Sequence, residues 1–495
     1  MSGAPPSGAA RGEGLLVAAL AAAAALRVLA FSAAFPFFTN VDEHKHVDSV
    51  LKYARGYWPR PGGDAFEPET AEWLGTYGSP EYHLEAGTPA PPPPWRRPAA
   101  AMLDKLERDR AFLAARSNKE AYQPPVYYAL AGAWLRAGRA LGLDGARLLY
   151  WVRGLGALGL GLLVLASHRS LARVYPDEAL VRLGVPALLA VFPLDAVTYV
   201  TPDALSPLLG GVAFLLALRV ARGGAGAGAC AAAGLATAAA CLAKYTNAAL
   251  FGALALSTRR ARRARPASLP AALVGMWALA LLPVAFWLAR NWLLFGDPTA
   301  TALKAQRLGW EPNPPSAWAL HPLWSPSGIA AFATGLCEKF WRGELVWHRE
   351  LLAWPPADWL YAATSLVFLA CAAFALAARR PGPGDRPSES AALLVLVLSV
   401  GELVVLSLLF RFPTEGNPSA ERPWFDHGRL VAGALVPFLV LYLRGLERAT
   451  SRLPGAAAPR AAWGVVALVM ATALASEIAL ARPVFHSAYN AYHLP

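Results

Sequence analysis

Two adjacent carboxylates, Asp42 and Glu43, follow the first long apolar segment of the chain, within the sequence VDEHKH. Carboxylates at the point where a membrane helix meets water can abstract a proton or bind a metal ion. Asp and Glu also favour the first turn of a helix, so the same pair would suit the start of the helix that follows. Taken alone, the position of the pair leaves both interpretations open.

The composition predicts an integral membrane protein. Of the 495 residues, 56% are hydrophobic and only 16% are charged. Long apolar runs alternate with short arginine-rich links, and about 20 apolar residues are what a helix needs to cross a bilayer. The net charge of +12 is spread over these links. It does not form a basic domain beside base-stacking aromatic residues, so we do not expect a nucleic-acid partner. The cysteines show neither metal-ligand spacing nor an obvious disulfide partner.

We expect an all-α, polytopic helical bundle with about eleven membrane spans. The candidate spans are segments 14–34, 146–167, 180–199, 203–221, 227–242, 245–257, 270–290, 357–378, 390–411, 427–447 and 461–481. Segment 123–142 is also apolar, but it opens with Gln-Pro-Pro, contains Arg136 and Arg139, and is apolar on one face only. These features are typical of a helix that lies along the membrane interface.

The distribution of positive charge supports leaving segment 123–142 out of the spans. Cytoplasmic links carry an excess of Lys and Arg. With the N-terminus inside, the inner links collect most of the arginines, including the clusters in 259–265 and 444–460. The predicted organisation is then a cytoplasmic N-terminus (1–13), a first span (14–34) that is too long for a signal-peptide core, an extracytoplasmic loop with interfacial helices (35–145), spans two to seven (146–290), a Trp-rich extracytoplasmic loop (291–356), spans eight to eleven (357–481) and an extracytoplasmic tail (482–495).

This topology places the unusual charges of the chain at the outer face. Asp42, Glu43 and Asp203 supply negative charge there, and the cations near the outer ends of spans are Arg153, Lys244, Arg290 and Arg429. A ring of cations at headgroup depth suits a phosphate on a lipid, and a carboxylate above it suits a base that acts on an acceptor from outside. The many Trp residues are consistent with an interfacial belt or with stacking on sugars.

Two arginines lie within predicted spans. Arg153 stands about two turns into its helix, where a charge is costly unless it is paired or functional. Its sequence context leaves both a structural and a functional role open. For Arg27, in the first span, we expect a structural role, either pairing with a carboxylate on a neighbouring helix or reaching the interface.

These motifs resemble those of the GT-C superfamily of membrane glycosyltransferases, of the protein mannosyltransferase and aminoarabinose transferase type. The sequence VDEHKH (41–46) resembles the Asp-Glu motif of the family's first external loop. The sequence QPPVYY (123–128) is similar to its interfacial His-Pro-Pro-Leu-Tyr-Tyr helix, with Gln as the first residue. TPD (201–203) resembles its second acidic motif, and FWRG (340–343) and HGR (427–429) resemble an uncharacterised bacterial branch.

The resemblance implies an inverting transfer of a sugar from a polyprenyl-phosphate donor to a glycan, lipid or protein acceptor outside the cytoplasm. Asp42 would be the general base, with Glu43 orienting it. The residues implied in binding the donor phosphate or lipid are Arg153, Lys244, Arg290, Arg429 and His427. Those implied in binding the acceptor or another part of the substrate are Asp203, Tyr127, Tyr128 and His46.

Family members differ in their need for a metal ion. Mg²⁺ or Mn²⁺ would suit the oxygens of Asp42, Glu43 and Asp203. Adjacent Asp and Glu do not, however, have the Asp-x-Asp spacing of the metal-dependent branch, so a metal-free site stays equally open.

Two other classes of function stay open. A transporter or lipid flippase would place polar groups near mid-bilayer and often shows inverted repeats, whereas this chain has its charges at one face and no evident repeat. A non-catalytic membrane scaffold would use the outer loops for binding, and Asp42 would be dispensable. The Ala, Gly, Pro and Arg bias favours a bacterial inner membrane with the active site facing the periplasm, with the endoplasmic reticulum as the alternative.

Overall fold

The computed structural model describes residues 8–38, 42–222, 226–264, 270–378 and 387–494. The parts of the predicted segments that fall on residues 1–7, 39–41, 223–225, 265–269, 379–386 and 495 lie outside these residues.

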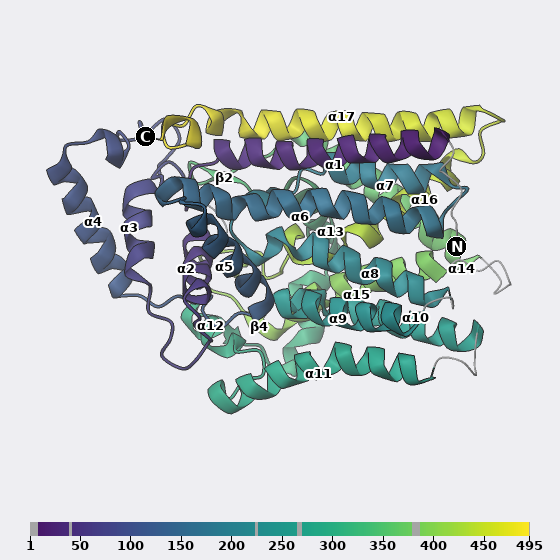
Figure 1. Cartoon of the computed structure of the whole chain (residues 1–495), viewed down its shortest axis with the longest axis horizontal. Helices are drawn as coiled ribbons and strands as arrows, with labels where there is room; N and C mark the ends of the chain where they lie inside the picture. The colour runs from purple at the N-terminus through teal and green to yellow at the C-terminus, as the bar shows by residue number, and fades with distance from the viewer. Residues whose placement is uncertain (1–7, 39–41, 223–225, 265–269, 379–386, 495) are drawn as a thin grey trace.

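The described chain is a bundle of long helices with a cap of shorter elements at one end (Figure 1). Seven of its helices belong to its longest apolar segments: α1 (Gly8–Ala34), α6 (Gly145–Val174), α11 (Pro270–Phe295), α14 (Pro355–Ala377), α15 (Pro387–Leu409), α16 (Leu435–Thr450) and α17 (Ala457–Phe485). Between them lie α7 (Ala179–Val191), α8 (Ser206–Ala221), α9 (Ala227–Ala243) and α10 (Leu250–Ala264). The prediction of an all-α membrane bundle is confirmed.

The connecting segments carry the remaining elements. The α-helices among them are α2 (Glu43–Ala54), α3 (Pro68–Tyr77), α4 (Ala99–Ala114), α5 (Pro125–Ala140), α12 (Thr301–Arg307) and α13 (Pro326–Arg342). Several of them begin at a proline, a residue that suits the first turn of a helix. The named strands of the described chain form two short antiparallel pairs: β1 (Glu311–Pro312) with β4 (Phe410–Arg411), and β2 (Val346–Trp347) with β3 (Glu350–Leu351).

Seven segments of the described chain are long and apolar enough to cross a membrane: Gly12–Ala34, Gly145–Val174, Ala271–Phe295, Pro355–Ala377, Ser388–Leu409, Gly428–Thr450 and Ala457–Phe485. The other four predicted spans coincide with α7, α8, α9 and α10, which are shorter. The total of eleven therefore stays a prediction.

Short 3₁₀ turns replace α-helix in three of these four predicted spans. Predicted span 180–199 ends as α-helix at Val191, just before Pro193, and continues as η2 (Asp195–Thr198). Span 203–221 overlaps η3 (Pro202–Ala204), and span 245–257 opens with η4 (Tyr245–Ala249). Proline cannot continue the α-helical hydrogen-bond ladder. Proline thus accounts for η2 and η3, whose Asp195 and Asp203 are buried.

Segment 123–142 forms α5, which is shorter than the helices that could cross a membrane and lies across their ends (Figure 1). Its partner on one side is α2, and the contact requires Gly132, because a Cβ there would lie 2.9 Å from the backbone nitrogen of Ala54. On the other side Trp134 stacks on Trp151 of α6, with ring centroids 4.2 Å apart. Helix α5 thus lies between α2, the helix that follows Asp42, and α6 of the bundle.

Arg27 has the structural role that we expected. Its guanidinium pairs with Glu477 of α17 at 2.5 Å and donates to the carbonyl oxygens of Ala190 and Phe192. The charge is therefore neutralised and hydrogen-bonded within the bundle, as a buried charge requires.

Candidate active site

Asp42 occupies the N-cap position of α2, in the left-handed region at φ 60°. Its side chain makes no capping hydrogen bond. Instead, Oδ1 accepts a hydrogen bond from Lys45 Nζ at 2.5 Å, and Oδ2 lies 3.0 Å from Lys119 Nζ. Asp is one of the residues that tolerate this backbone conformation. The carboxylate thus bridges a lysine of its own helix and a lysine of the segment before α5.

Glu43 has a different environment from that of its neighbour. Its side chain is fully buried, and both oxygens pair with the guanidinium of Arg153, at 2.8 Å and 2.6 Å. The same oxygens accept the backbone N–H groups of Phe38 and Val200, each at 3.0 Å. Glu43 therefore anchors α2 to α6 and has no oxygen left for a substrate or a metal ion.

Arg153 is correspondingly engaged on all sides. Beyond Glu43, it donates to the carbonyl oxygens of Ser32, Phe35 and Pro36. It does not line the cavity described below. The structure thus corrects the expectation that Arg153 binds the donor phosphate, because an arginine whose donors are all used within the protein has none to offer.

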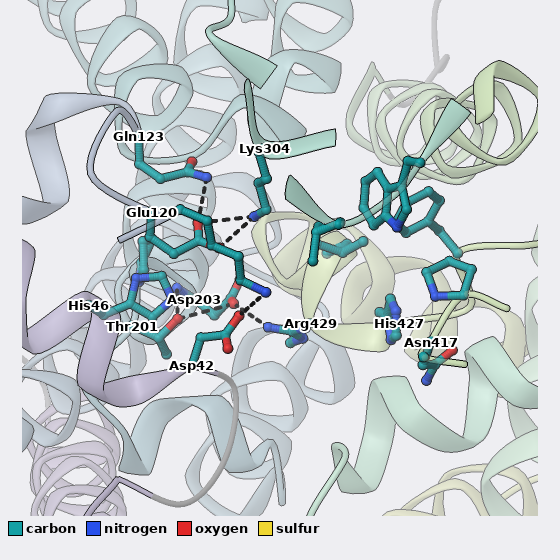
Figure 2. A pocket seen from close by; sticks show the side chains of 18 of the residues that line it. Asp42, His46, Glu120, Gln123, Thr201, Asp203, Lys304, Asn417, His427 and Arg429 are labelled. Atoms are coloured by element: carbon teal, nitrogen blue, oxygen red, sulfur yellow. Dashed lines mark hydrogen bonds and ion pairs between the residues drawn. The ribbon is translucent and has the colours of Figure 1, made fainter. Parts of the chain in front are cut away.

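A polar cavity of about 260 Å³ opens beside Asp42 (Figure 2). It is lined by Asp42, His46, Lys119, Glu120, Gln123, Thr201, Pro202, Asp203, Lys244, Lys304, Leu308, Trp310, Pro413, Glu415, Gly416, Asn417, Pro418, Phe425, His427, Arg429 and Leu430. The structure therefore brings together residues from α2, η3, the end of α9, α12 and the start of η7 (Gly428–Ala434), which are far apart in the sequence.

The cavity contains cations and carboxylates in alternation. Lys304 pairs with Glu120 at 2.8 Å, and Lys244 pairs with Asp203. Arg429 lies 3.6 Å from Oδ2 of Asp203, whereas Lys244 pairs with Oδ1. Each of the four lining cations, which are Lys119, Lys244, Lys304 and Arg429, lies beside a carboxylate.

Glu344 contacts two of the cavity residues, Arg429 and His427. It accepts a hydrogen bond from Arg429 Nε at 3.3 Å and contacts His427 Nδ1 at 2.6 Å. Burial favours the neutral acid, but His427, Arg429 and Lys339 outweigh it and lower the pKa of Glu344 to about 2. The carboxylate is therefore ionised and fixes the positions of both basic side chains.

The charge states of the lining residues follow from burial and from their neighbours. Burial lowers the pKa of His46 to about 4, although Glu120 opposes the shift, so the imidazole is neutral near pH 7. For Glu120, Lys304 outweighs burial and the pKa falls to about 2. Burial, Arg429 and Lys304 all lower the pKa of Lys244. An anion bound between these cations would relieve their mutual repulsion.

The pKa of Asp42 also lies below its ordinary value. Burial alone would raise it, but Lys45 and Lys119 outweigh that effect. Asp42 is therefore a carboxylate at neutral pH, which is the form that accepts a proton.

Besides Arg153, three residues that the sequence predicted as binding groups lie outside the cavity. Tyr127 and Tyr128 are buried beneath it, and the Tyr128 hydroxyl holds His46 Nδ1 at 2.8 Å. Arg290 lines a separate groove with residues 55–60 and stacks against Trp58 and Trp287. By contrast, the predicted Asp42, His46, Asp203, Lys244, His427 and Arg429 all line the cavity.

Sequence reasoning missed several residues of the site. Lys119 and Glu120 stand just before the Gln-Pro-Pro motif, and this proximity was the available signal. Lys304, Trp310 and Glu344 come from the Trp-rich loop. No motif or spacing distinguishes them there from the other polar and aromatic residues of the loop. They are recognised only by their contacts.

A second, more apolar chamber of about 410 Å³ adjoins the polar cavity. The residues common to both are Lys119, Gln123, Lys244, Lys304, Trp310, Phe425 and Leu430. Its other walls include Leu406 and Leu409 of α15, one of the helices that could cross a membrane. The lysines thus stand between a polar space and an apolar one.

A divalent metal ion does not fit the three carboxylates that the sequence offered for it. Both oxygens of Glu43 are paired with Arg153, and Asp42 and Asp203 are each paired with lysine. Within the described ranges, no group of three or more His, Cys, Asp and Glu side chains could hold a metal ion. We therefore derive no step through a metal.

No protein-family model matches the sequence, and no curated protein matches it. Among solved structures, the chain is similar to ArnT from Cupriavidus metallidurans bound to undecaprenyl phosphate, with 14% identity, a TM-score of 0.42, and coverage of 94% of this chain and 75% of ArnT. It is also similar to the oligosaccharyltransferase of Archaeoglobus fulgidus in its apo form, with 12% identity, a TM-score of 0.39, and coverage of 95% of this chain and 56% of that one. At these identities and TM-scores the comparisons assign no residue of the cavity.

Proposed function

We propose that this protein is a membrane glycosyltransferase that moves a sugar from a polyprenyl-phosphate donor to an acceptor on the extracytoplasmic side. The observation that carries the proposal is the position of the Asp42 carboxylate in one cavity with four cations, at the capped end of a membrane bundle and beside an apolar chamber. A lipid phosphate needs both surroundings, because its phosphate is anionic and its chain is apolar.

The two spaces suggest how such a donor would bind. The first isoprene units would occupy the apolar chamber beside Leu406 and Leu409, and the sugar would project into the polar cavity. The phosphate would then lie at the shared wall, near Lys119, Lys244 and Lys304. Trp310, which lines both spaces, is placed to stack on the sugar.

In the proposed reaction Asp42 takes the proton from the acceptor hydroxyl. The acceptor oxygen attacks the anomeric carbon as the bond from that carbon to the phosphate oxygen breaks, and the electron pair leaves with the polyprenyl phosphate. Attack from the side opposite the leaving group inverts the anomeric centre. The cations of the shared wall stabilise the negative charge that develops on the leaving phosphate.

The test is transfer of radiolabelled sugar from polyprenyl-phosphate donors by the purified full chain in nanodiscs. Asp42→Asn keeps the shape of the side chain and removes the base, so we expect a loss of about 10²–10⁴-fold in rate. The matched control is Asp104→Asn, which removes an exposed carboxylate on α4 and should retain full activity. Unchanged transfer by Asp42→Asn would reject Asp42 as the base, and absence of transfer by the wild type from any such donor would reject the function.

A further inference from the structure

The proposed base has two lysine partners with different surroundings. Lys45 lies one turn along α2 from Asp42, and it is not part of the cavity wall. Lys119 comes from the segment before α5, and it lines the polar cavity and the apolar chamber alike. Both lysines contact Asp42, but of the two only Lys119 is also in a position to contact a donor bound in the cavity.

The backbone that carries Lys119 is firmly attached to α2. The neighbouring Asn118 is fully buried, and its Nδ2 donates to the carbonyl oxygen of Lys45 and to Asp48 Oδ2, each at 2.8 Å. Asp48 is itself buried and paired with Lys52 at 2.7 Å. This network fixes the Cα of Lys119 beside Asp42. The ammonium group, at the end of a flexible four-carbon chain, can still change its partner.

The other lysines of the shared wall do not contact the base. Lys244 is paired with Asp203, and Lys304 is paired with Glu120. A phosphate arriving at the shared wall would compete with Asp42 for Lys119, because a lysine ammonium is a compact charge that binds phosphate well.

We propose that Lys119 links donor binding to the readiness of the base: it holds Asp42 before the donor arrives and moves to the donor phosphate afterwards, leaving Asp42 with Lys45 alone. The proposal rests on the proposed function. Removing one neighbouring cation raises the pKa of a carboxylate. Asp42 therefore becomes a stronger base when a donor is in place.

A thermodynamic cycle of phosphate binding tests the exchange without relying on turnover. The probe is farnesyl phosphate, and its Kd is measured by calorimetry for the full chain in nanodiscs. In the wild type, binding must break the contact between Lys119 and Asp42. Asp42→Asn removes this competition and should tighten binding about fivefold, the scale of one partly exposed ion pair. In the Lys119→Met background, Asp42→Asn should have no such effect.

The opposite outcome has a distinct signature. If Asp42 merely repels the phosphate through its charge, Asp42→Asn will tighten binding equally with and without Lys119, and that additivity would overturn the proposal while leaving the function intact. Failure of the wild type to bind farnesyl phosphate would overturn both.

Two further variants serve as controls. Lys45→Met removes the lysine that does not reach the cavity, so it should change the Kd by less than about threefold and preserve the effect of Asp42→Asn. Lys119→Arg keeps a cation at the shared wall and should restore the dependence on Asp42. If Lys119→Met elutes as an aggregate in size-exclusion chromatography, the effect of Asp42→Asn on the Kd is compared between Lys119→Arg and the wild type instead.

Discussion

Glu43 and Arg153 form a bidentate ion pair in which both side chains are completely shielded from solvent. The two nitrogen–oxygen distances are 2.8 Å and 2.6 Å. The pair joins α2 to α6 and so places Asp42, the residue before Glu43, at the edge of the cavity. Of these two adjacent carboxylates, Glu43 has a structural role and Asp42 faces the cavity.

We expect Arg153→Met to destabilise the protein by about 3–5 kcal/mol, because Glu43 would remain buried without its counter-charge. The double variant with Glu43→Gln should recover part of the loss, since the unpaired charge is then absent. Thermal unfolding in detergent, followed by tryptophan fluorescence, measures both. Arg108→Met, at the exposed pair with Asp104 on α4, is the control and should shift stability by no more than about 1 kcal/mol.

Two arginines that the sequence treated alike should differ in their effect on transfer. Arg429 lines the cavity and Arg290 does not. Arg429→Ala should lower kcat about 10²–10³-fold, the usual effect of removing one group that stabilises developing charge. Arg290→Ala should leave kcat within about threefold of the wild type, the scale of a lost surface contact. An equal loss in both would contradict the assignment of the reaction to the polar cavity.

His46 should make the fold sensitive to mild acid. Burial lowers its pKa to about 4 in the folded chain, against about 6.5 when unfolded. Between these values the unfolded state binds more protons, so stability should fall as pH drops from 6.5 to 4, by at most about 3 kcal/mol. His46→Asn should flatten the dependence of the thermal midpoint on pH in this window. His83→Gln, in an exposed loop, should keep the wild-type dependence.

Gly132 should be needed for the approach of α5 to α2. In Gly132→Val the added side chain meets the backbone of Tyr53 and Ala54, and overpacking of this kind costs about 1–3 kcal/mol. Because the contact also positions α2, the variant should lose transfer activity at temperatures where it is still folded. Gly275→Ala, at a helical position of α11 with no atom within 4 Å of the added methyl, should be neutral or slightly stabilising. Equal thermal midpoints for Gly132→Val and the wild type would contradict this account.

Much of the architecture could be predicted because it depends on local properties of the chain. Runs of apolar residues indicated the long helices, and the one-sided pattern with Pro125 at its start indicated the short helix α5. The prediction was less accurate where proline and polar residues interrupt an apolar run. After Pro193 and from Pro202 the backbone forms short 3₁₀-helices, because proline cannot continue the α-helical hydrogen bonds.

The sequence by itself determined that the chain is a helical membrane protein, and its motifs indicated that Asp42, Asp203 and Arg429 belong to one end of it. Hydropathy and charge order along the chain suffice for that, because a bilayer sorts segments by their own composition. Only the tertiary structure decided which charges meet. Glu43 pairs with Arg153 across 110 positions of sequence, and Arg429 meets Glu344 across 85. Electrostatic interaction falls with distance in space, which the order of residues does not specify.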